Sequence, residues 1–167
     1  MTDDPLPDRR ALAEGRAEAF AELYDRHAAR MLAVARAITG RTADAEDAVH
    51  QTFLELYRSR GALASARDER AYLVRAVRHS ALRVRARRRD EPMEREPATP
   101  REPEGDPELE HALASLPAEQ REVLALKLDG ELTFEQIGAV LAIPANTAAS
   151  RYRYALEKLR ALRGGGG

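Results

Sequence analysis

The stretch from Thr133 to Arg151 reads TFEQIGAVLAIPANTAASR, and it decides how the rest of the sequence is interpreted. Thr133 and Gln136 have the spacing of a capping box, which predicts a short helix that ends before the residues AIPA at 142–145. Asn146 can then cap a second, longer helix. Two helices joined by about four residues, the second of them basic, predict a helix-turn-helix.

Two further helices are expected just before this pair. One spans Pro107 to Ser115, and the other spans Glu119 to Leu128 and ends at Asp129-Gly130. On the last helix of the chain, small and apolar residues recur on one side and polar residues on another. The polar set lies near the helix N-terminus, where exposed N–H groups and the dipole favour phosphate. This outward set consists of Asn146, Thr147, Ser150, Arg151 and Tyr154.

Three helices are also expected in the first half of the chain. Apolar residues recur at steps of three and four from Phe20 to Ile38, before Thr39-Gly40 ends the first helix. Thr42 is expected to cap the second helix, which stops near Gly61. The third runs from about Glu69 to Arg88, with one apolar side and the rest basic. The apolar stripes of the first two helices comprise Phe20, Leu23, Tyr24, Leu32, Ala35, Ile38, Val49, Phe53, Leu56 and Tyr57.

The segment between the two halves is acidic and rich in proline. Five of the nine prolines fall between positions 92 and 107, and residues 90–110 carry −7 because nine acids oppose two arginines. Such a composition cannot bury enough apolar surface to order itself, which predicts a linker. We therefore expect an all-α chain of two small helical domains: a helical bundle at 9–89, a flexible acidic linker at 90–108, a helix-turn-helix domain at 109–163 and a flexible tail at 164–167.

Positive charge is concentrated on two of the expected helices, although the net charge is only −1. Residues 67–89 carry +7 from nine arginines and two acids, and residues 146–163 carry +4 from four arginines, one lysine and one glutamate. Basic charge gathered on a helix is what phosphate contact needs, and a solvated helix surface explains the same pattern. The polar start from Met1 to Arg10 predicts neither a signal peptide nor a membrane anchor, so we expect a cytoplasmic protein.

The sequence does not predict catalysis, a metal or a cofactor. The chain has no cysteine, its four histidines are scattered, and it contains no glycine-rich phosphate loop. The best metal pair, Glu46 and His50, lacks a third ligand. We therefore expect no enzymatic activity, no catalytic residue, no metal site and no cofactor.

Three segments of the chain resemble sigma factors of the extracytoplasmic-function (ECF) group in the sigma-70 family. DAEDAVHQTFL at 44–54 is similar to the helix with which these factors bind core RNA polymerase. AYLVRAVRH at 71–79, followed by three arginines at 87–89, is similar to their promoter-melting and minus-ten-reading helix. LASLPAEQREVL at 113–124, together with the segment quoted first, is similar to their minus-thirty-five-binding domain. The three segments have the family's order and spacing and cover nearly the whole chain.

The resemblance implies a sigma factor that binds core RNA polymerase and directs promoter-specific transcription initiation. Its partners would be bacterial core RNA polymerase and promoter DNA, with an anti-sigma factor as a candidate third partner and no membrane insertion. The implied polymerase-binding residues are Asp44, Glu46, Asp47 and Gln51, although acids at these positions also suit the helix dipole. The implied minus-ten residues are Tyr72, Arg75, Arg78, His79, Arg83, Arg87 and Arg88. The outward set of the last helix would contact the minus-thirty-five element.

Several positions depart from the family's usual pattern. His50 and Gln51 replace a Gln-Glu pair, and His79 replaces a common Asn. Tyr72 replaces a common Trp, so that stacking on a base and packing in the core are equally good interpretations of this residue. Ala142 occupies a turn where Gly often sits, and its Cβ is strained if the turn requires a positive φ. Ala149 and Tyr154 stand where Lys and Arg are common, so the promoter sequence cannot be carried over.

A stand-alone helix-turn-helix DNA-binding regulator is the alternative function. It would explain only the last third of the chain, and it gives no reason for the DAED segment or for the basic helix of the first half. A family member that binds polymerase without supporting transcription would also fit the departures. The acidic linker is open to two interpretations, as an imitation of nucleic acid inside the polymerase or as a solvated spacer.

Overall fold

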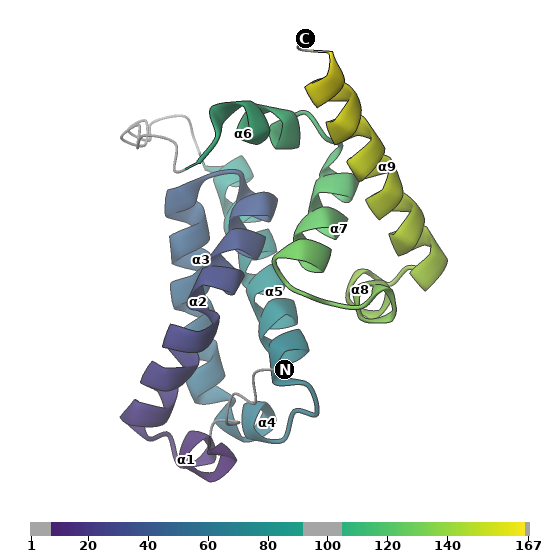
Figure 1. Cartoon of the computed structure of the whole chain (residues 1–167). Coiled ribbons are helices and arrows are strands. Elements are labelled where there is room, and N and C mark those ends of the chain that lie inside the picture. Colours follow the sequence, from purple (N-terminus) through teal and green to yellow (C-terminus); the bar gives the residue numbers. More distant parts are fainter. Residues whose placement is uncertain (1–7, 92–104, 166–167) are drawn as a thin grey trace.

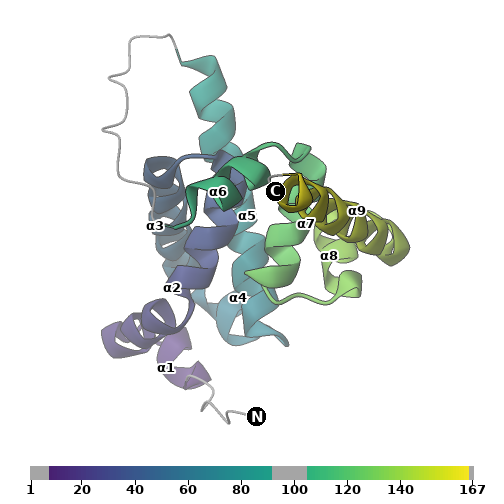
Figure 2. The same ribbon diagram turned by 45° about the horizontal axis from the view of Figure 1, so that its top comes forward.

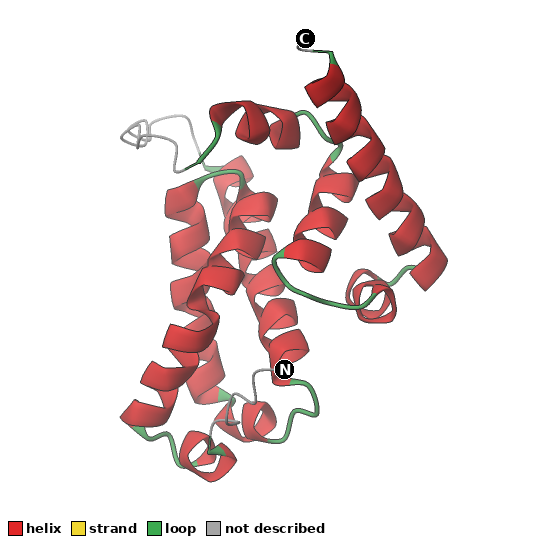
Figure 3. Cartoon of the chain, viewed as in Figure 1, coloured by secondary structure: helices red, strands yellow, loops and turns green. Residues whose placement is uncertain are grey.

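The computed structural model describes residues 8–91 and 105–165, and over these residues the chain forms helices and no strand (Figures 1 and 3). The predicted all-α fold with two helical domains is confirmed. The domain boundaries stay a prediction, and most of the expected linker lies outside the described residues. The first half contains α1 (Arg9–Ala13), α2 (Ala17–Thr39), α3 (Thr42–Arg58), α4 (Arg60–Ala64) and α5 (Glu69–Asp90). The second half contains α6 (Pro107–Ala114), α7 (Ala118–Leu128), α8 (Phe134–Leu141) and α9 (Ala145–Gly164).

Helices α2, α3 and α5 pack against one another as a three-helix bundle, and α1 packs against α4 at one end of it (Figure 1). The apolar side of each long helix faces the bundle axis, so that Leu23, Leu56 and Leu73 are almost completely buried. Burial of one such side chain stabilises the fold by about 1.5–3 kcal/mol. The bundle thus rests on the three- and four-residue periodicity that the sequence shows.

The ends of the first long helices differ in part from the sequence-based expectation. Gly40 ends α2 as predicted, and it adopts the left-handed conformation, with φ of 73°. Arg41, not Thr42, is the N-cap of α3, and no side chain caps this end. The expected stop near Gly61 is also wrong, because α3 ends at Arg58 and Gly61 lies inside α4. The buried side chain of Leu63 anchors this short additional helix to the core.

The amino-terminal end of α8 has the predicted capping box. The Thr133 hydroxyl accepts a hydrogen bond from the Gln136 N–H at 3.1 Å, and the Thr133 N–H donates to the Gln136 side-chain oxygen at 2.9 Å. Both bonds satisfy N–H groups that a helix start would otherwise leave without partners. The sequence therefore predicted this helix start at the level of individual atoms.

The turn between α8 and α9 is tight and strained. Ala142 has φ of 56° and ψ of 45°, so this residue does adopt the left-handed conformation that costs a non-glycine residue on the order of 1 kcal/mol. Gly138 allows the chain to approach closely, because a Cβ at this position would lie 2.7 Å from the Ile143 carbonyl oxygen. Asn146 was expected to be the N-cap of α9, and this prediction is wrong. Pro144 takes that place, and its carbonyl accepts the N–H groups of residues 147 and 148.

The carboxy-terminal domain lies against the bundle through α7, which packs on α2 (Figures 1 and 2). Val123, Leu126 and Ile137 are fully buried and belong to the same apolar cluster as the core of the bundle. A second, smaller cluster, formed around Leu116 and Leu124, is internal to the carboxy-terminal domain. The two domains are therefore docked on each other through apolar side chains in this structure.

Candidate nucleic-acid and polymerase interfaces

The exposed side of α3 carries three of the four predicted polymerase-binding residues. Glu46 and Asp47 are exposed, and Gln51 is half-buried one turn further along the helix. Asp44 is different, since it is only 2% exposed and points into the bundle. The polar face of α3 thus begins at Glu46, two residues later than the sequence suggested.

Asp44 forms an ion pair with Arg88, one of the predicted minus-ten residues. Its Oδ1 atom accepts hydrogen bonds from Arg88 Nε at 2.7 Å and from Arg88 Nη2 at 2.6 Å. The pair ties the first turn of α3 to the last turns of α5. Because a buried carboxylate needs a charged partner, each residue is already committed to the other. In the described structure, neither side chain is available for the partner that the sequence assigned to it.

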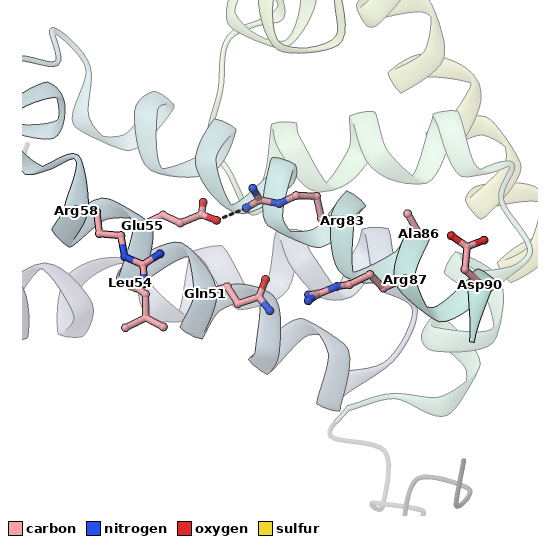
Figure 4. A pocket seen from close by; sticks show the side chains of 8 residues that line it. All are labelled: Gln51, Leu54, Glu55, Arg58, Arg83, Ala86, Arg87 and Asp90. Carbon is pink, nitrogen blue, oxygen red and sulfur yellow. Dashed lines mark hydrogen bonds and ion pairs between the residues drawn. The ribbon is translucent and has the colours of Figure 1, made fainter. Parts of the chain in front are cut away.

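Two grooves flank the exposed side of α3, and Leu54 lines both of them. The groove toward α5 has a volume of about 550 Å³ (Figure 4). Arg87 points from α5 toward Gln51 across it, and an ion pair of 2.5 Å between Arg83 and Glu55 bridges the two helices. This groove therefore combines an exposed leucine with charged groups of both signs.

The second groove lies between α3 and α2, has a volume of about 360 Å³ and is mainly apolar. Tyr24 and Tyr57 are 51% and 49% exposed there, and Leu54 is 49% exposed. The sequence had placed both tyrosines in the buried stripes of their helices. Tyr57 instead packs edgewise on Phe20 and lies under the Arg60 guanidinium, and Tyr24 packs at a tilt on Phe53. Periodicity alone did not distinguish a core position from an apolar position at the margin of the core.

The basic helix α5 presents one continuous exposed face. Tyr72, Arg75, His79 and Arg83 follow one another at steps of three and four residues and therefore lie on the same side of the helix. Arg75 and His79 are exposed, whereas Tyr72 is half-buried and packs against the core cluster. Tyr72 thus both packs against the core and remains partly exposed. Arg87 continues this face toward the carboxyl end of the helix.

Arg78 points away from this face and toward the carboxy-terminal domain. Its Nε donates a hydrogen bond of 2.5 Å to the Glu122 carboxylate on α7. Both side chains are about four-fifths shielded from solvent. Of the seven predicted minus-ten residues, three form ion pairs with carboxylates inside the described structure: Arg78 with Glu122, Arg88 with Asp44, and the more exposed Arg83 with Glu55.

The predicted minus-thirty-five face lies on the first three turns of α9, and the amino-terminal end of this helix lies beside α8, away from the bundle (Figure 1). Asn146 and Tyr154 are exposed, and the opposite side of the helix buries Ala148 and Ala155 as predicted. Arg151 makes one long ion pair of 3.8 Å with Glu119. Arg153 is also exposed beside this face and packs over the Tyr154 ring at 5.5 Å, although the sequence analysis had not selected it. Its position seven residues after Asn146, two helical turns, could have identified it.

Within residues 8–91 and 105–165, no group of three histidine, aspartate or glutamate side chains is arranged to hold a metal ion. Across the same residues, every helix is too short or too polar to cross a bilayer. The site thus consists of three surfaces, which are the α3 face with its two grooves, the basic face of α5 and the outward face of α9.

Comparisons with known proteins agree with this arrangement. Residues 23–91 match the family "Sigma-70 region 2", and residues 112–161 match "Sigma-70, region 4". The chain is 31% identical over 161 residues to RNA polymerase sigma factor CarQ of Myxococcus xanthus, covering 90% of this chain and 92% of CarQ. It is 32% identical over 150 residues to ECF RNA polymerase sigma factor SigL of Mycobacterium tuberculosis, covering 83% of this chain and 85% of SigL.

Solved structures share the fold. The structure of CnrH in complex with the cytosolic domain of CnrY superimposes with a TM-score of 0.70 at 22% identity, covering 95% of this chain and 96% of CnrH. The sigma factor RpoE of Bartonella quintana, solved with the anti-sigma factor NepR, gives a TM-score of 0.67 at 21% identity and covers 87% and 97%. Together with the sequence matches, these results show that the chain belongs to the sigma-70 family, as an ECF RNA polymerase sigma factor.

Proposed function

We propose that this sigma factor docks on core RNA polymerase through the exposed side of α3 and contacts promoter DNA through α5 and α9. The observation that carries the proposal is the presence of two arginine-rich helices in separate domains, each with an exposed face, in a chain whose halves match two sigma-70 regions. A protein that reads a single DNA site would need only one of these arginine-rich helices. A protein that contacts two promoter elements needs both helices.

The polymerase contact is centred on Asp47, Gln51 and Leu54. Asp47 and Glu46 supply negative charge for basic groups of the polymerase, while Leu54 and the neighbouring tyrosines, Tyr24 and Tyr57, supply exposed apolar area. Interfaces usually obtain most of their affinity from a few apolar or aromatic anchors surrounded by polar groups. The grooves on either side of Leu54 are where side chains of the polymerase would insert.

The minus-ten contact is assigned to the exposed face of α5. Arg75, Arg83 and Arg87 neutralise backbone phosphates, and each contact of this kind adds roughly 0.9 to the salt dependence of binding. Tyr72, which is half-buried, offers the exposed part of its ring to an unstacked base, for which stacking on an aromatic is worth about 1–3 kcal/mol. Its packing against the core holds the ring in place. Arg78 and Arg88 are omitted from this surface because they are largely shielded and paired with Glu122 and Asp44, whereas the side chain of Arg83, which pairs with Glu55, is 53% exposed.

The minus-thirty-five contact is assigned to the amino-terminal turns of α9. Asn146 and Ser150 lie one turn apart on the outward side and suit hydrogen bonds to base edges in the major groove. Arg151 and Arg153 flank them and suit phosphates. Arg151 gives up only a long ion pair with Glu119 when it binds DNA.

This function has its place in the cytoplasm, where core polymerase and promoters lie, and it requires no catalytic group, metal or cofactor of the chain itself. The polymerase carries out the chemistry of transcription. An anti-sigma factor is proposed as a further partner, since the solved relative RpoE was captured with one, NepR.

Co-elution with purified core polymerase, followed by run-off transcription from the DNA upstream of the gene, tests the proposal. We expect Asp47→Arg to lose co-elution, while Glu108→Arg, a charge-matched change on α6, retains it. Arg151→Ala should retain co-elution and lose transcription, with Arg160→Ala near the end of the same helix as its control. Specific DNA binding without any polymerase binding would contradict the proposal and favour the stand-alone regulator.

A further inference from the structure

Helix α1 is a part of the bundle that the family match does not cover. The match to region 2 begins at residue 23, whereas α1 spans Arg9–Ala13 and packs against α4 at one end of the bundle (Figure 1). A helix of five residues is unstable by itself in water. The Leu12 side chain is 1% exposed and belongs to the core cluster of the bundle, so packing holds α1 in place. The contacts of α1 are therefore the evidence for what this helix does.

The side chain of Arg60 joins three elements at this end of the bundle. Its Nε donates a hydrogen bond of 3.2 Å to the carbonyl oxygen of Ala13, the last residue of α1. Its Nη1 donates a hydrogen bond of 3.0 Å to the carbonyl oxygen of Tyr57, in the last turn of α3. Because the guanidinium is planar and rigid, two bonds from different nitrogen atoms fix its plane. Arg60, which is the first residue of α4, thus connects α1, α3 and α4 in one geometry.

The fixed guanidinium lies over the ring of Tyr57. The Arg60 Cζ atom is 4.8 Å from the ring centroid, which is within the range of a cation–π interaction. The same ring packs edgewise on Phe20 of α2, with the two centroids 5.5 Å apart. Tyr57 is nevertheless 49% exposed, and it lines the mainly apolar groove between α2 and α3. An exposed ring is therefore held by an arginine and by a phenylalanine.

Gly15, in the turn between α1 and α2, makes room for this arrangement. Its φ is 73°, and a Cβ at this position would lie 3.1 Å from both Arg60 Nε and Tyr57 Cε2. A side chain here would therefore displace the guanidinium, the ring or both. Gly40 has the same φ of 73°, but nothing lies within 4 Å of a Cβ built there. The chain thus contains one left-handed glycine that packs on the Arg60–Tyr57 pair and another that serves as its control.

A ring that is fixed in advance binds a partner better than a mobile ring. Binding immobilises side chains at an interface, and the entropy lost in this way weakens the complex unless the side chain is already held. Tyrosine is also one of the residues that most often anchor an interface. The residues that line the α2–α3 groove include Tyr57 but not Arg60. An effect of Arg60 on docking at this groove would therefore act through the Tyr57 ring.

We propose that Arg60 is a positioning residue for polymerase docking. Supported by α1 and accommodated by Gly15, Arg60 holds the Tyr57 ring at the edge of the α2–α3 groove in the orientation that polymerase binds. The identity of the partner rests on the proposed function. The positioning of the ring rests on the free protein alone and has a measurement of its own.

Fluorine NMR of the chain labelled with 3-fluorotyrosine measures the ring in the free protein. The chain has five tyrosines, and Tyr57→Phe identifies the resonance of Tyr57. We expect Arg60→Ala and Gly15→Ala to shift this resonance, because the cation is removed from the ring or pushed away from it. Arg9→Ala, at an exposed position on α1, and Gly40→Ala should leave the resonance where it is. An unshifted resonance in both Arg60→Ala and Gly15→Ala would overturn the positioning of the ring.

Equilibrium titration with core polymerase measures the consequence for docking. Arg60→Ala should weaken binding about three- to fivefold, which corresponds to the loss of a partly exposed cation–π contact. In a Tyr57→Ala background, Arg60→Ala should change the affinity by less than about twofold, because the ring that Arg60 positions is gone. In a Tyr24→Ala background, which lacks the other exposed tyrosine of the groove, Arg60→Ala should keep its full effect.

Two further variants separate positioning of the ring from general support of the bundle. Gly15→Ala and Gly40→Ala introduce the same left-handed strain, so both should lower the free energy of unfolding in urea, but only Gly15→Ala should weaken polymerase binding. Arg60→Lys retains a cation but lacks the planar fork that reaches both carbonyls, and it should recover part of the affinity. An effect of Arg60→Ala on affinity that is equally large with and without Tyr57 would mean that Arg60 only supports α1, and the proposal would be wrong.

Failure of this proposal is distinguishable from failure of the proposed function. If the unchanged chain binds polymerase and Tyr57→Ala binds equally well, Arg60 does not position an anchor for docking, while the proposed function stands. If the unchanged chain does not bind polymerase, the proposed function and the docking role of Arg60 are both wrong. The fluorine spectra then still decide whether Arg60 holds the Tyr57 ring.

Discussion

The two domains of this sigma factor are stabilised in different ways. The bundle of α2, α3 and α5 buries large side chains from three long helices around its own axis. The carboxy-terminal domain has a small internal cluster around Leu116 and Leu124, and it buries Val123, Leu126 and Ile137 in the cluster that it shares with the bundle. A domain of this size can bury only a modest apolar core by itself. The comparison indicates that the bundle supports the smaller domain, and not the reverse.

The largest effect should follow from Leu73→Ala, which removes a side chain that is 1% exposed at the centre of α5. We expect the free energy of unfolding of the bundle to fall by about 3 kcal/mol, because the change leaves a cavity in a packed core. The carboxy-terminal domain should become less protected as well, since its docking surface is lost. Hydrogen exchange measured separately on α2 and α9 would show this.

Leu124→Ala is the reciprocal change, in the internal cluster of the carboxy-terminal domain. Amide hydrogen exchange in α9 should become faster, while hydrogen exchange in α2 stays unchanged. Equal loss of protection in both domains after Leu124→Ala would contradict the asymmetry.

Arg88→Ala should lower the stability of the bundle by about 2 kcal/mol, because the Asp44 carboxylate would be left buried without its partner. The partial exposure of Arg88, at 23%, keeps the effect below that of a fully buried pair. Urea unfolding of Arg88→Ala, Asp44→Ala and the double variant would measure it. If the pair stabilises the bundle, the double variant should be less destabilised than the sum of the two single variants.

Ala142→Gly should raise the stability of the carboxy-terminal domain by about 0.5–1 kcal/mol. Glycine adopts φ of 56° without a Cβ clash, which outweighs the greater freedom of the unfolded chain. Thermal unfolding followed in α9 would report the gain. Ala139→Gly, at an exposed position inside α8, is the control and should be destabilising.

The smallest effect is a pH dependence at the start of α5. The hydrogen bond from the Ala71 N–H holds the pKa of Asp68 below its usual value, and the hydrogen bond from Gln136 adds to this effect. A carboxylate with a lowered pKa in the folded state stabilises the protein above about pH 4 and loses that contribution as the pH falls further. Between pH 5 and pH 3, the free energy of unfolding should therefore vary less with pH in Asp68→Asn, which retains a capping side chain, than in the unchanged protein. Identical slopes of the free energy of unfolding against pH for the two proteins would contradict this prediction.

Sequence reasoning was most accurate where local chemistry decides the structure. The capping box at Thr133, the end of α2 at Gly40 and the buried side of α9 depend on residues within one or two turns of each other. Sequence reasoning failed at the N-caps of α3 and α9. In both cases the N-cap lies one or two residues before the polar residue that was expected to take that place, Arg41 before Thr42 and Pro144 before Asn146.

The candidate polymerase and DNA surfaces were predictable as helix faces but not residue by residue. Asp44 and Arg88 are 44 positions apart, and local spacing cannot show that they pair. Tyr24 and Tyr57 follow the apolar periodicity of their helices, but they lie at the margin of the bundle and remain half-exposed. Which apolar residue is inside depends on the crossing of neighbouring helices, and that is a tertiary property.

The sequence by itself determined the all-helical fold, the helix-turn-helix and the gathering of arginines on two helices, because periodicity, capping and charge act over a few residues. Only the tertiary structure decided which of those arginines remain exposed. Arg78 and Arg88 are held by carboxylates from distant parts of the chain, Glu122 and Asp44, whereas Arg75 and Arg153 face the solvent. The physical reason is that ion pairs of this kind form between residues that only the packing of helices and the docking of the two domains bring within 3 Å of each other.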